Sequence, residues 1–411
     1  MRKSFYMACA AAMLLASCSQ DEFSGNDAES NEALQPIKIG VTQKNIRNTR
    51  GTGTVGGVVN GEGQDVEYTN QWAGESFNLF MFKHGTLDLA TCKYEREGMQ
   101  TYVGPVFDNQ EFKAPNGHDG SVSEEASNYY AAATNGDIRY YPTQGAYDFW
   151  AYRLDDCEKL ADYATEDNKL YIDFVMDGSQ DIMTAKAEPS AEQIEAAGGE
   201  EYKERFFSAW TARKDINPCL KFVHELTRLK FFVKGGNDDA VNPEKGIKVE
   251  SIKVISKNSG RLIVAYTPEA NVTDNIEWNE ATDTMTLKQR NGEANEALEV
   301  LEAVSPSSTS EYDKVGEALM VAPQDEYEII ITISQQLKLN TSDEEASKTY
   351  TEVKTVIKPQ ESNTEDMTFE KGYSYNVKMT LYGLQEIKIS TELAPWTSGE
   401  DIEFTPEEDE F

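Results

Sequence analysis

A single thiol, Cys18, has the sequence context of a processed residue. It follows Leu15-Ala16-Ser17, and before these lie a positive start, Arg2 and Lys3, and an apolar run over residues 5–16. A positive start, a short apolar core and small residues at the cut are typical of a secretory signal peptide. A membrane span needs roughly 20 apolar residues, more than this run supplies. We therefore expect residues 1–17 to be removed, so that Cys18 becomes the first mature residue.

The segment Leu15-Ala16-Ser17-Cys18 resembles the lipobox of bacterial lipoproteins, in which the cysteine sulfur takes a diacylglyceryl group. Each buried methylene contributes about 0.8 kcal/mol and stable anchoring takes two acyl chains, which a diacylated cysteine supplies. Ser19-Gln20-Asp21-Glu22, which follow, are similar to the acidic export signal of surface lipoproteins in Bacteroidetes-type bacteria. The resemblance implies a lipid-anchored, surface-exposed protein of the cell outer membrane.

The sequence contains no residue set with the spacing of a known catalytic motif. Its three histidines are His84, His118 and His224. Neither a G-x-S-x-G elbow nor a P-loop occurs, and His224-Glu225 lacks the second histidine of H-E-x-x-H. The apolar neighbours of His224 predict a packed, hydrogen-bonded side chain. We expect no enzyme activity and no cofactor, although a carboxylate pair brought together by the fold for glycoside hydrolysis stays open.

The acidic residues indicate a solvated surface. Asp155-Asp156 and Asp238-Asp239 offer oxygen ligands for calcium, but without the twelve-residue EF-hand spacing. In a chain with 72 acidic residues such pairs are expected by chance, so no metal site is predicted. Removal of residues 1–17 leaves 36 basic against 72 acidic residues, a formal charge of −36. Because phosphates would be repelled, nucleic acid is excluded as a partner.

Three cysteines remain once Cys9 leaves with the signal peptide and Cys18 is lipidated. They are Cys92, Cys157 and Cys219, and no two have the C-x-x-C spacing. An odd number without that spacing argues against a disulfide framework or a zinc site. Buried free thiols and one bridge among the three both stay open, because an exported protein meets an oxidising compartment.

The elements that position these residues are predicted to be mostly β-strands. Helices are expected only within residues 124–134 and 191–210, the second interrupted by Gly198 and Gly199. Many short strands separated by turn residues predict an all-β fold of antiparallel sandwiches. The segments with period-two alternation or apolar aromatic runs are residues 37–41, 77–82, 147–152, 171–174, 229–233, 247–255, 262–266, 326–333, 350–357, 373–381 and 387–393.

Composition divides the chain into four parts. Residues 1–17 are the signal peptide, and residues 18–50 hold a polar tether and the first strand. Residues 51–218 and 219–411 each have the size of a sandwich domain, with the boundary placed near Asn217-Pro218. Arg47 and Arg50 lie in a polar, Gly-rich stretch that predicts an exposed loop after the first strand.

Several segments, taken in order, resemble the fimbrillins, the type V pilus subunits of Bacteroidetes-type bacteria, and their Mfa-like relatives. The resemblance spans most of the chain, and its specificity lies in the order of the pieces. After the lipobox and its acidic follow-on, these are Ile37-Lys38-Ile39, Thr49-Arg50-Gly51, Leu79-Phe80-Met81-Phe82, Tyr140-Tyr141-Pro142, Asp148-Phe149-Trp150-Ala151-Tyr152, Gln180-Asp181-Ile182-Met183-Thr184-Ala185, Phe222-Val223-His224-Glu225-Leu226, Arg228-Leu229-Lys230-Phe231, Phe369-Glu370-Lys371-Gly372-Tyr373-Ser374-Tyr375 and Pro395-Trp396.

The resemblance implies two transthyretin-like β-sandwich domains and polymerisation by donor-strand exchange. In the family an Arg-specific protease cuts an N-terminal loop, the first strand leaves, and a strand of another subunit fills the groove by β-augmentation. The expected scissile bond is Arg50-Gly51, with the bond after Arg47 as second choice. Arg50 as an ordinary exposed loop residue is the alternative. The released strand would carry Ile37, Ile39 and Val41.

The donor would come from the C-terminal end. Ile387, Ile389 and Leu393 share the period-two pattern of the first strand, so they suit similar pockets. An equally weighted alternative makes this segment an ordinary strand of the second domain. The chain departs from the family in its long acidic tail, residues 396–411, which leaves the role of the end open.

These features together predict a structural and adhesive subunit of a fimbrium. Its expected partners are other pilus subunits, the outer membrane through its lipid, an Arg-specific protease, and host or bacterial surface ligands. Stalk, tip and lipid-anchored anchor subunits are not distinguished by the sequence. A non-polymerising surface lipoprotein that binds glycans is the alternative of another class, and a hydrolase is disfavoured by the missing motifs.

Overall fold

The computed structural model describes the chain in segments. These are residues 34–43, 72–73, 75–93, 103–114, 116–118, 130–136, 138–154, 157–160, 162–242, 247–289, 298–337, 347–359, 368–382 and 387–394. All of them except Leu34 belong to one unit, residues 35–411. Cys18, Arg47, Arg50 and Gly51 lie outside the described residues. Among the described helices, none has the length and apolar character needed to cross a membrane.

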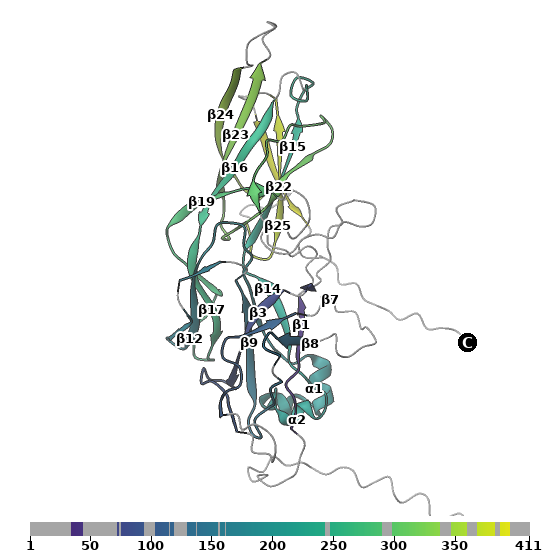
Figure 1. Ribbon diagram of the computed structural model, residues 1–411, viewed down its shortest axis with the longest axis vertical. Coiled ribbons are helices and arrows are strands. Elements are labelled where there is room, and N and C mark those ends of the chain that lie inside the picture. The colour runs from purple at the N-terminus through teal and green to yellow at the C-terminus, as the bar shows by residue number, and fades with distance from the viewer. Residues whose placement is uncertain are drawn as a thin grey trace, which may run out of the picture. The chain divides into compact units, whose positions relative to one another are not determined.

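Seven strands form a closed ring of hydrogen-bonded neighbours in the first half of the described chain (Figure 1). Their order around the ring is β1 (Ile39–Gln43), β14 (Cys219–His224), β13 (Met183–Lys186), β9 (Tyr147–Arg153), β3 (Ser76–Lys83), β6 (Gln110–Lys113) and β8 (Tyr130–Ala133). The pair β1 and β14 is parallel, and every other neighbouring pair in the ring is antiparallel.

Aromatic side chains fill the ring. Phe77 of β3 packs on Phe112 and Phe222, with ring centroids 5.8 and 5.3 Å apart. Central strand β9 is buried on both faces, from Phe149 to Tyr152. A strand covered on both faces needs a continuous apolar run instead of alternation. The run of residues 147–152 therefore specifies a central strand.

A second sheet runs in the order β10 (Glu158–Lys159), β12 (Lys169–Val175), β17 (Ser259–Tyr266) and β18 (Ile276–Trp278), with β11 (Ala164–Glu166) also paired to β12. Strands β12 and β17 pair from Lys169 opposite Tyr266 to Val175 opposite Ser259. This pairing, and the place of β14 in the ring, cross the predicted boundary at residue 218. The boundary is corrected accordingly: Pro218 is buried and immediately precedes β14, so the turn residues mark the start of a strand.

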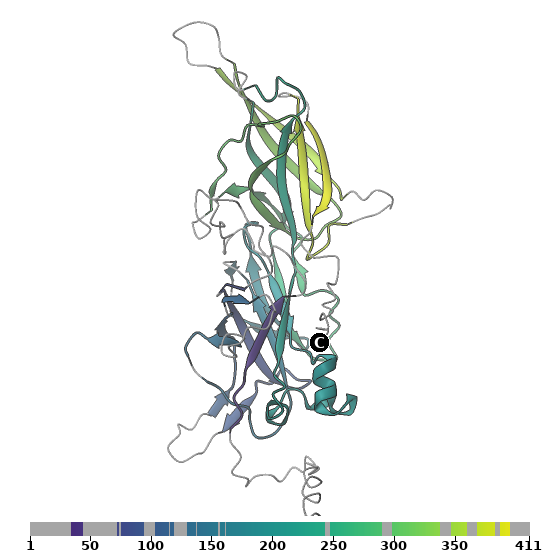
Figure 2. The same ribbon diagram turned by 90° about the vertical axis from the view of Figure 1, so that its right-hand side faces the viewer.

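The C-terminal part is a sandwich of two four-stranded sheets (Figure 2). One has the order β22 (Asp313–Val321), β15 (Thr227–Gly235), β25 (Ser374–Leu381) and β26 (Ile387–Ala394). The other has the order β19 (Thr282–Thr286), β16 (Lys248–Lys257), β23 (Tyr327–Leu337) and β24 (Ser347–Ile357). Every second residue of β15 is buried, and these residues join those of β16, β23 and β25 in one hydrophobic cluster. The predicted strands correspond to six of the eight in this sandwich, and β19 and β22 were missed.

Short pairs and short helices complete the described fold. The pairs are β2 (Trp72–Ala73) with β7 (Asn116–His118), β4 (Thr91–Lys93) with β5 (Val103–Pro105), and β20 (Lys288–Gln289) with β21 (Glu299–Val300). The helices are α1 (Ala191–Ala197), the 3-10 helix η2 (Glu200–Arg205) and α2 (Ala209–Ala212). The predicted all-β class with a few short helices is confirmed.

The helix predictions have different outcomes. Between α1 and η2, Gly198 and Gly199 have φ of 120° and 131°, which only glycine adopts readily, so the predicted interruption is confirmed. A helix over residues 124–134 is wrong where the structure describes it, because residues 130–133 form β8. Pairing with β1 and β6 on its two sides outweighs the helix propensity of the three alanines.

Candidate functional site

Strand β1 closes the ring by pairing on both of its edges. On one side Gly40 to Gln43 run parallel to Cys219 to Phe222 of β14. On the other side Ile39 and Gly40 pair antiparallel with Ala131 and Tyr130 of β8. The backbone N–H of Gly40 donates to the carbonyl of Pro218 at 2.9 Å. The ring therefore depends on β1 for the hydrogen-bonding partners of two other strands.

The apolar positions predicted for the released strand are found on β1 and just before it. Ile39 and Val41 are 1% and 3% exposed, and Ile37 is half-buried. The strand begins two residues later than predicted, but Ile37 already donates its N–H to the carbonyl of Arg139 at 2.9 Å. Loss of β1 would uncover an apolar stripe and the unpaired edges of β8 and β14, a template for another strand.

Gly40 of β1 lies opposite Cys219 of β14. A Cβ placed on Gly40 would lie 3.4 Å from Sγ and 3.5 Å from Cβ of Cys219. Both are ordinary contact distances. Cys219 is half-buried, whereas Cys92 and Cys157 are buried, and no disulfide joins any two of the three. Cys219 is therefore a thiol that lies next to β1.

The candidate donor segment is an edge strand in this structure. Strand β26 pairs antiparallel with β25 over its whole length, from Ile387 opposite Leu381 to Ala394 opposite Ser374. Ile389 packs against the hydrophobic cluster of the sandwich, and Thr391 is buried with its hydroxyl donating to the carbonyl of Lys358. The side chains of Ile387 and Leu393 lie outside what the structure describes. The position of β26 in the C-terminal sandwich corresponds to the alternative that the sequence left open, an ordinary strand of the second domain.

The predicted released and donor strands thus occupy different sheets. Strand β1 lies in the ring and β26 at the edge of the β22-β15-β25-β26 sheet. Within the described residues the two strands do not pair with each other.

A buried polar network, which sequence reasoning missed, lies beside β14. The Glu225 side chain is 0% exposed and accepts from Thr184 Oγ1 at 2.5 Å, Asn275 Nδ2 at 2.6 Å and Lys371 Nζ at 2.8 Å. Burial by itself lowers the pKa of Lys371, but the charges and hydrogen bonds of Glu225 and Asp274 outweigh it, and the pKa is raised. Glu225 therefore joins β13 to the segments before β18 and β25.

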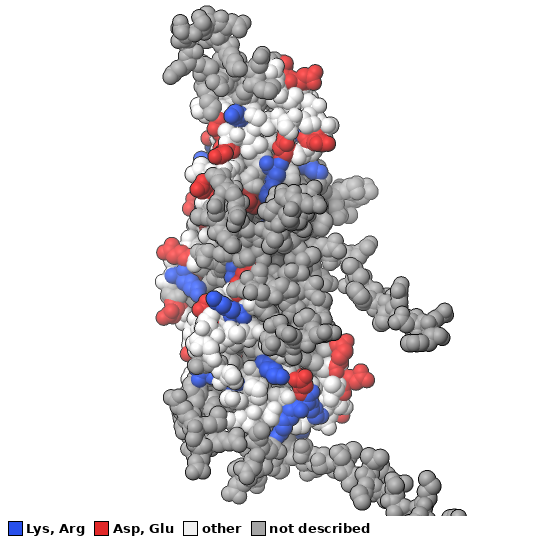
Figure 3. Space-filling model, turned by 45° about the vertical axis from the view of Figure 1, so that its right-hand side comes forward, with Lys and Arg blue, Asp and Glu red and all other residues white. Residues whose placement is uncertain are grey.

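His224 is packed in the way the sequence predicted. Its Nδ1 lies 2.6 Å from Oδ2 of Asp181, and the two side chains are 0% and 2% exposed. Among the described residues, no cluster of His, Cys, Asp and Glu has the arrangement of a metal site. Figure 3 shows acidic and basic side chains interspersed over the described part of the face in view.

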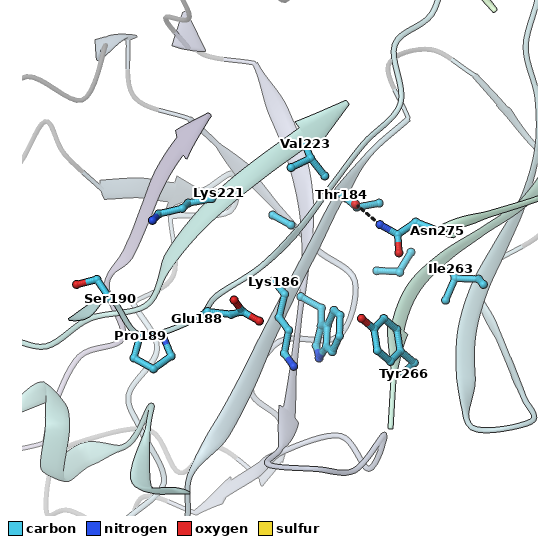
Figure 4. Close-up of a pocket in the computed structure, with 13 residues that line it drawn as sticks. Thr184, Lys186, Glu188, Pro189, Ser190, Lys221, Val223, Ile263, Tyr266 and Asn275 are labelled. Carbon is cyan, nitrogen blue, oxygen red and sulfur yellow. Dashed lines mark hydrogen bonds between the residues drawn. The ribbon is translucent and has the colours of Figure 1, made fainter. Parts of the chain in front are cut away.

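A cavity of about 320 Å³ opens between the ring and the second sheet (Figure 4). Strands β9, β13, β14 and β17, residues 188–190 before α1 and the residue before β18 supply its walls. Trp150, Lys186 and Tyr266 line it, together with Thr184 and Asn275 from the Glu225 network. This site could not be predicted from the sequence, because its residues come from four strands and two connecting segments that lie apart in the chain.

Comparisons with known proteins give a likeness to solved structures alone. No family model matches the chain, and no curated protein matches it. A proposed cell adhesion protein of Bacteroides uniformis is similar over 90% of this chain and 100% of its own, at 12% identity and a TM-score of 0.43. One from Bacteroides ovatus is similar over 89% of this chain and 99% of its own, at 15% identity and a TM-score of 0.37.

A fimbrial protein of Bacteroides ovatus is similar over 85% of this chain and 49% of its own, at 13% identity and a TM-score of 0.27. With TM-scores below 0.5 in all three cases, these likenesses decide neither family nor activity. A function for this chain has to be argued from its strands and side chains.

Proposed function

We propose that this chain is a structural and adhesive pilus subunit, exported as a lipoprotein on Cys18 and joined to other subunits by exchange of its first strand. It performs no catalysis. The observation that carries the proposal is the position of β1, which closes the ring and lies N-terminal to both Arg47 and Arg50. A cut after either arginine leaves β1 without a covalent link to any other described strand.

After such a cut β1 would be held by a modest free energy. Burial of Ile39 and Val41 contributes about 1.5–3 kcal/mol each to holding β1 in the ring. Once β1 has left, the exposed edges of β8 and β14 can form backbone hydrogen bonds with another strand. A donor strand from another subunit would restore the backbone pairing and the buried side chains together. Strand β26, with eight residues against five in β1, offers a longer strand with the same alternation.

The proposed partners follow from this pathway. They are an Arg-specific protease that cuts Arg50-Gly51 or the bond after Arg47, other pilus subunits, the outer membrane through the lipid, and host or bacterial surface ligands. An acidic surface with a formal net charge of −34 for the whole chain keeps free subunits apart until strand exchange joins them.

The N-terminus and mass of the protein recovered from the native cell surface test the proposal. We expect a chain that begins at Gly51 or Asn48 and carries no lipid, present in ladders that resist SDS. Replacing Arg47 and Arg50 together by lysine should leave a lipidated chain that begins at Cys18 and forms no ladder. A lipidated, unclipped wild-type chain would contradict strand exchange, and would favour an anchor subunit or a non-polymerising glycan-binding lipoprotein.

A further inference from the structure

The cavity beside β13 brings together groups of three chemical kinds. Aromatic rings come from Trp150 and Tyr266, ammonium groups from Lys186 and Lys221, and oxygen acceptors from Glu188 and Asn275. In the view of Figure 4, Glu188 and Lys186 lie next to each other, Tyr266 and Asn275 lie to their right, and Lys221 lies apart on the left. Its volume of about 320 Å³ lies at the small end of the range for small-molecule sites, about 300–1,000 Å³.

Trp150 fixes the position of the ammonium group. The indole is only 5% exposed, and its ring centroid lies 4.8 Å from that of Tyr266. Nζ of Lys186 sits 4.5 Å from the centre of the Trp150 ring, a cation–π distance. Because Trp150 is buried and Tyr266 is half-buried, the aromatic pair gives the ammonium group of Lys186 a defined surface to lie on at the cavity.

The Glu225 network fixes the orientation of the amide. Asn275 Nδ2 donates to Thr184 Oγ1 at 3.0 Å and to Glu225 Oε1 at 2.6 Å, which commits both amide hydrogens. Thr184 is itself 5% exposed and donates to the same carboxylate. What Asn275 offers a ligand is therefore its carbonyl oxygen, a hydrogen-bond acceptor held by a buried anion.

The charges on the lining select among ligand classes. Two lysines and one glutamate give it a formal charge of +1, in a chain whose net charge is −34. That balance suits one carboxylate, which Lys186 can bind through a charge-assisted hydrogen bond. The acceptors Glu188 and Asn275 suit hydroxyl donors, and they would repel the several oxygens of a phosphate dianion. An aliphatic ligand would leave these polar groups without partners.

We propose that this cavity binds a sugar residue that carries a carboxylate, such as a uronic or sialic acid at the end of a surface glycan. Lys186 binds the carboxylate, Asn275 and Glu188 accept from ring hydroxyls, and Tyr266 packs against the sugar ring. This inference rests on the adhesive role in the proposed function and specifies the class of ligand that the adhesin would bind. It does not depend on strand exchange, because all its residues lie within one copy of the chain.

Binding is tested on residues 18–411 with Cys18→Ser, which prevents lipidation and keeps β1 covalently attached to the chain. Glucuronate and N-acetylneuraminate are titrated by calorimetry and saturation-transfer NMR, with methyl glucoside as the neutral probe. We expect saturable binding of an acidic sugar, at least about tenfold tighter than the neutral one, the difference expected for one charge-assisted hydrogen bond. No saturable binding of either acidic sugar, or equal binding of the neutral one, would overturn the proposal.

Two substitutions in the cavity have opposite expected effects. Lys186→Met keeps the aliphatic stem over Trp150 and should weaken acidic-sugar binding about tenfold, and Lys186→Arg should restore most of it. Glu188→Gln removes the negative charge and should strengthen binding. Lys214→Met is the matched control, because Lys214 also sits over a tryptophan ring, 4.2 Å from the centre of Trp210, but outside the cavity.

The controls separate binding from folding and from assembly. Urea unfolding of each variant shows whether the fold is kept, and Lys214→Met should bind as wild type. Unchanged affinity in both Lys186→Met and Glu188→Gln would overturn the cavity as the binding site. Failure to form ladders, with acidic-sugar binding intact, would count against the proposed polymerisation and leave this site standing.

Discussion

Glu225 joins three segments that lie far apart in the sequence. Its carboxylate is 0% exposed and receives hydrogen bonds from residues 41, 50 and 146 positions away in the sequence. The role of Glu225 could not be predicted from the sequence, because its hydrogen-bonding partners lie far from it in the chain. The packing of His224, in contrast, could be predicted, since its apolar neighbours are local.

Substitution of Glu225 should strongly destabilise the protein. Glu225→Ala removes the acceptor of Thr184, Asn275 and Lys371, and breaking a buried charge pair typically costs about 3–5 kcal/mol of unfolding free energy. The matched control is Asp274→Ala, which removes the half-exposed second partner of Lys371 and should cost less than about 1 kcal/mol. Urea unfolding measures both, and equal losses would contradict the role given to Glu225.

His84 should make stability depend on pH. Partial burial alone lowers the pKa of His84, but hydrogen bonds and charges from Asp148 and Glu204, 2.9 and 3.0 Å away, outweigh it and raise the pKa above 6.5. A raised pKa in the folded state means that the stabilisation is fully present below pH 6.5 and is lost as pH rises through the folded-state pKa.

NMR titration of the His84 ring checks this directly. The pKa of His84 should lie above 6.5 in the wild type. It should fall in Asp148→Asn, because the Asp148 side chain that stabilises the charged ring is only 14% exposed. Glu204→Gln should have a smaller effect, because the Glu204 side chain is 85% exposed and well screened. A pKa below 6.5 in the wild type would contradict the predicted sign.

At the scale of elements, Gly40 and Cys219 allow β1 to be locked in place. A cysteine at position 40 would have its Cβ 3.5 Å from that of Cys219, close to the range of roughly 3.5–4.5 Å seen in disulfides. In Gly40→Cys we expect a bond between β1 and β14 that prevents strand release, so that ladders form only after reduction. Non-reducing gels after proteolytic trimming measure this.

Two variants control for the substitution itself. Gly40→Ala adds a Cβ at ordinary contact distance and should assemble as wild type. Gly40→Cys combined with Cys219→Ser cannot form the bond and should assemble without reductant. Full assembly of oxidised, cross-linked Gly40→Cys would show that β1 need not leave the ring.

The sequence predicted elements well where one periodicity dominated. Alternation over residues 229–233 and 373–381 became β15 and β25, strands buried on one face. Strand β13, Met183–Lys186, was missed, because four residues are too few to show a period. Strand β8 was predicted to be helical. Its conformation depends on pairing with β1 and β6 on its two edges, and residues 130–133 alone do not reveal that pairing.

At the scale of the whole molecule, the sheets do not follow the order of the chain. Strands β14, β17 and β18 follow residue 218 yet pair with strands that precede it or with each other. Asn217-Pro218 was interpreted as a domain boundary, but these residues precede β14, and the sequence could not show which sheet that strand joins. The all-β class could thus be predicted from composition and periodicity, whereas the pairing of distant strands, and the cavity that it creates, could not.

Residues 51–411 hold 32 basic and 67 acidic residues, and this formal charge of −35 should make assembly of trimmed subunits sensitive to salt. Raising the ionic strength from 0.01 to 0.15 M shortens the Debye length from about 30 to about 8 Å, which screens repulsion between copies. We expect trimmed subunits to form ladders faster at the higher ionic strength, measured by gel densitometry over time. Slower assembly at high salt would instead indicate attraction between oppositely charged surfaces.

The most direct test of strand exchange is a cross-link between two copies of the chain. Cysteine is placed in turn at positions 388, 390 and 392, which alternate with the apolar residues of the donor segment, and trimmed subunits are assembled and oxidised. If the donor replaces β1, at least one of the three should bond to Cys219 of another copy, and Cys219→Ser should abolish the product. SDS-resistant ladders without such a bond at any of the three positions would contradict the proposed exchange.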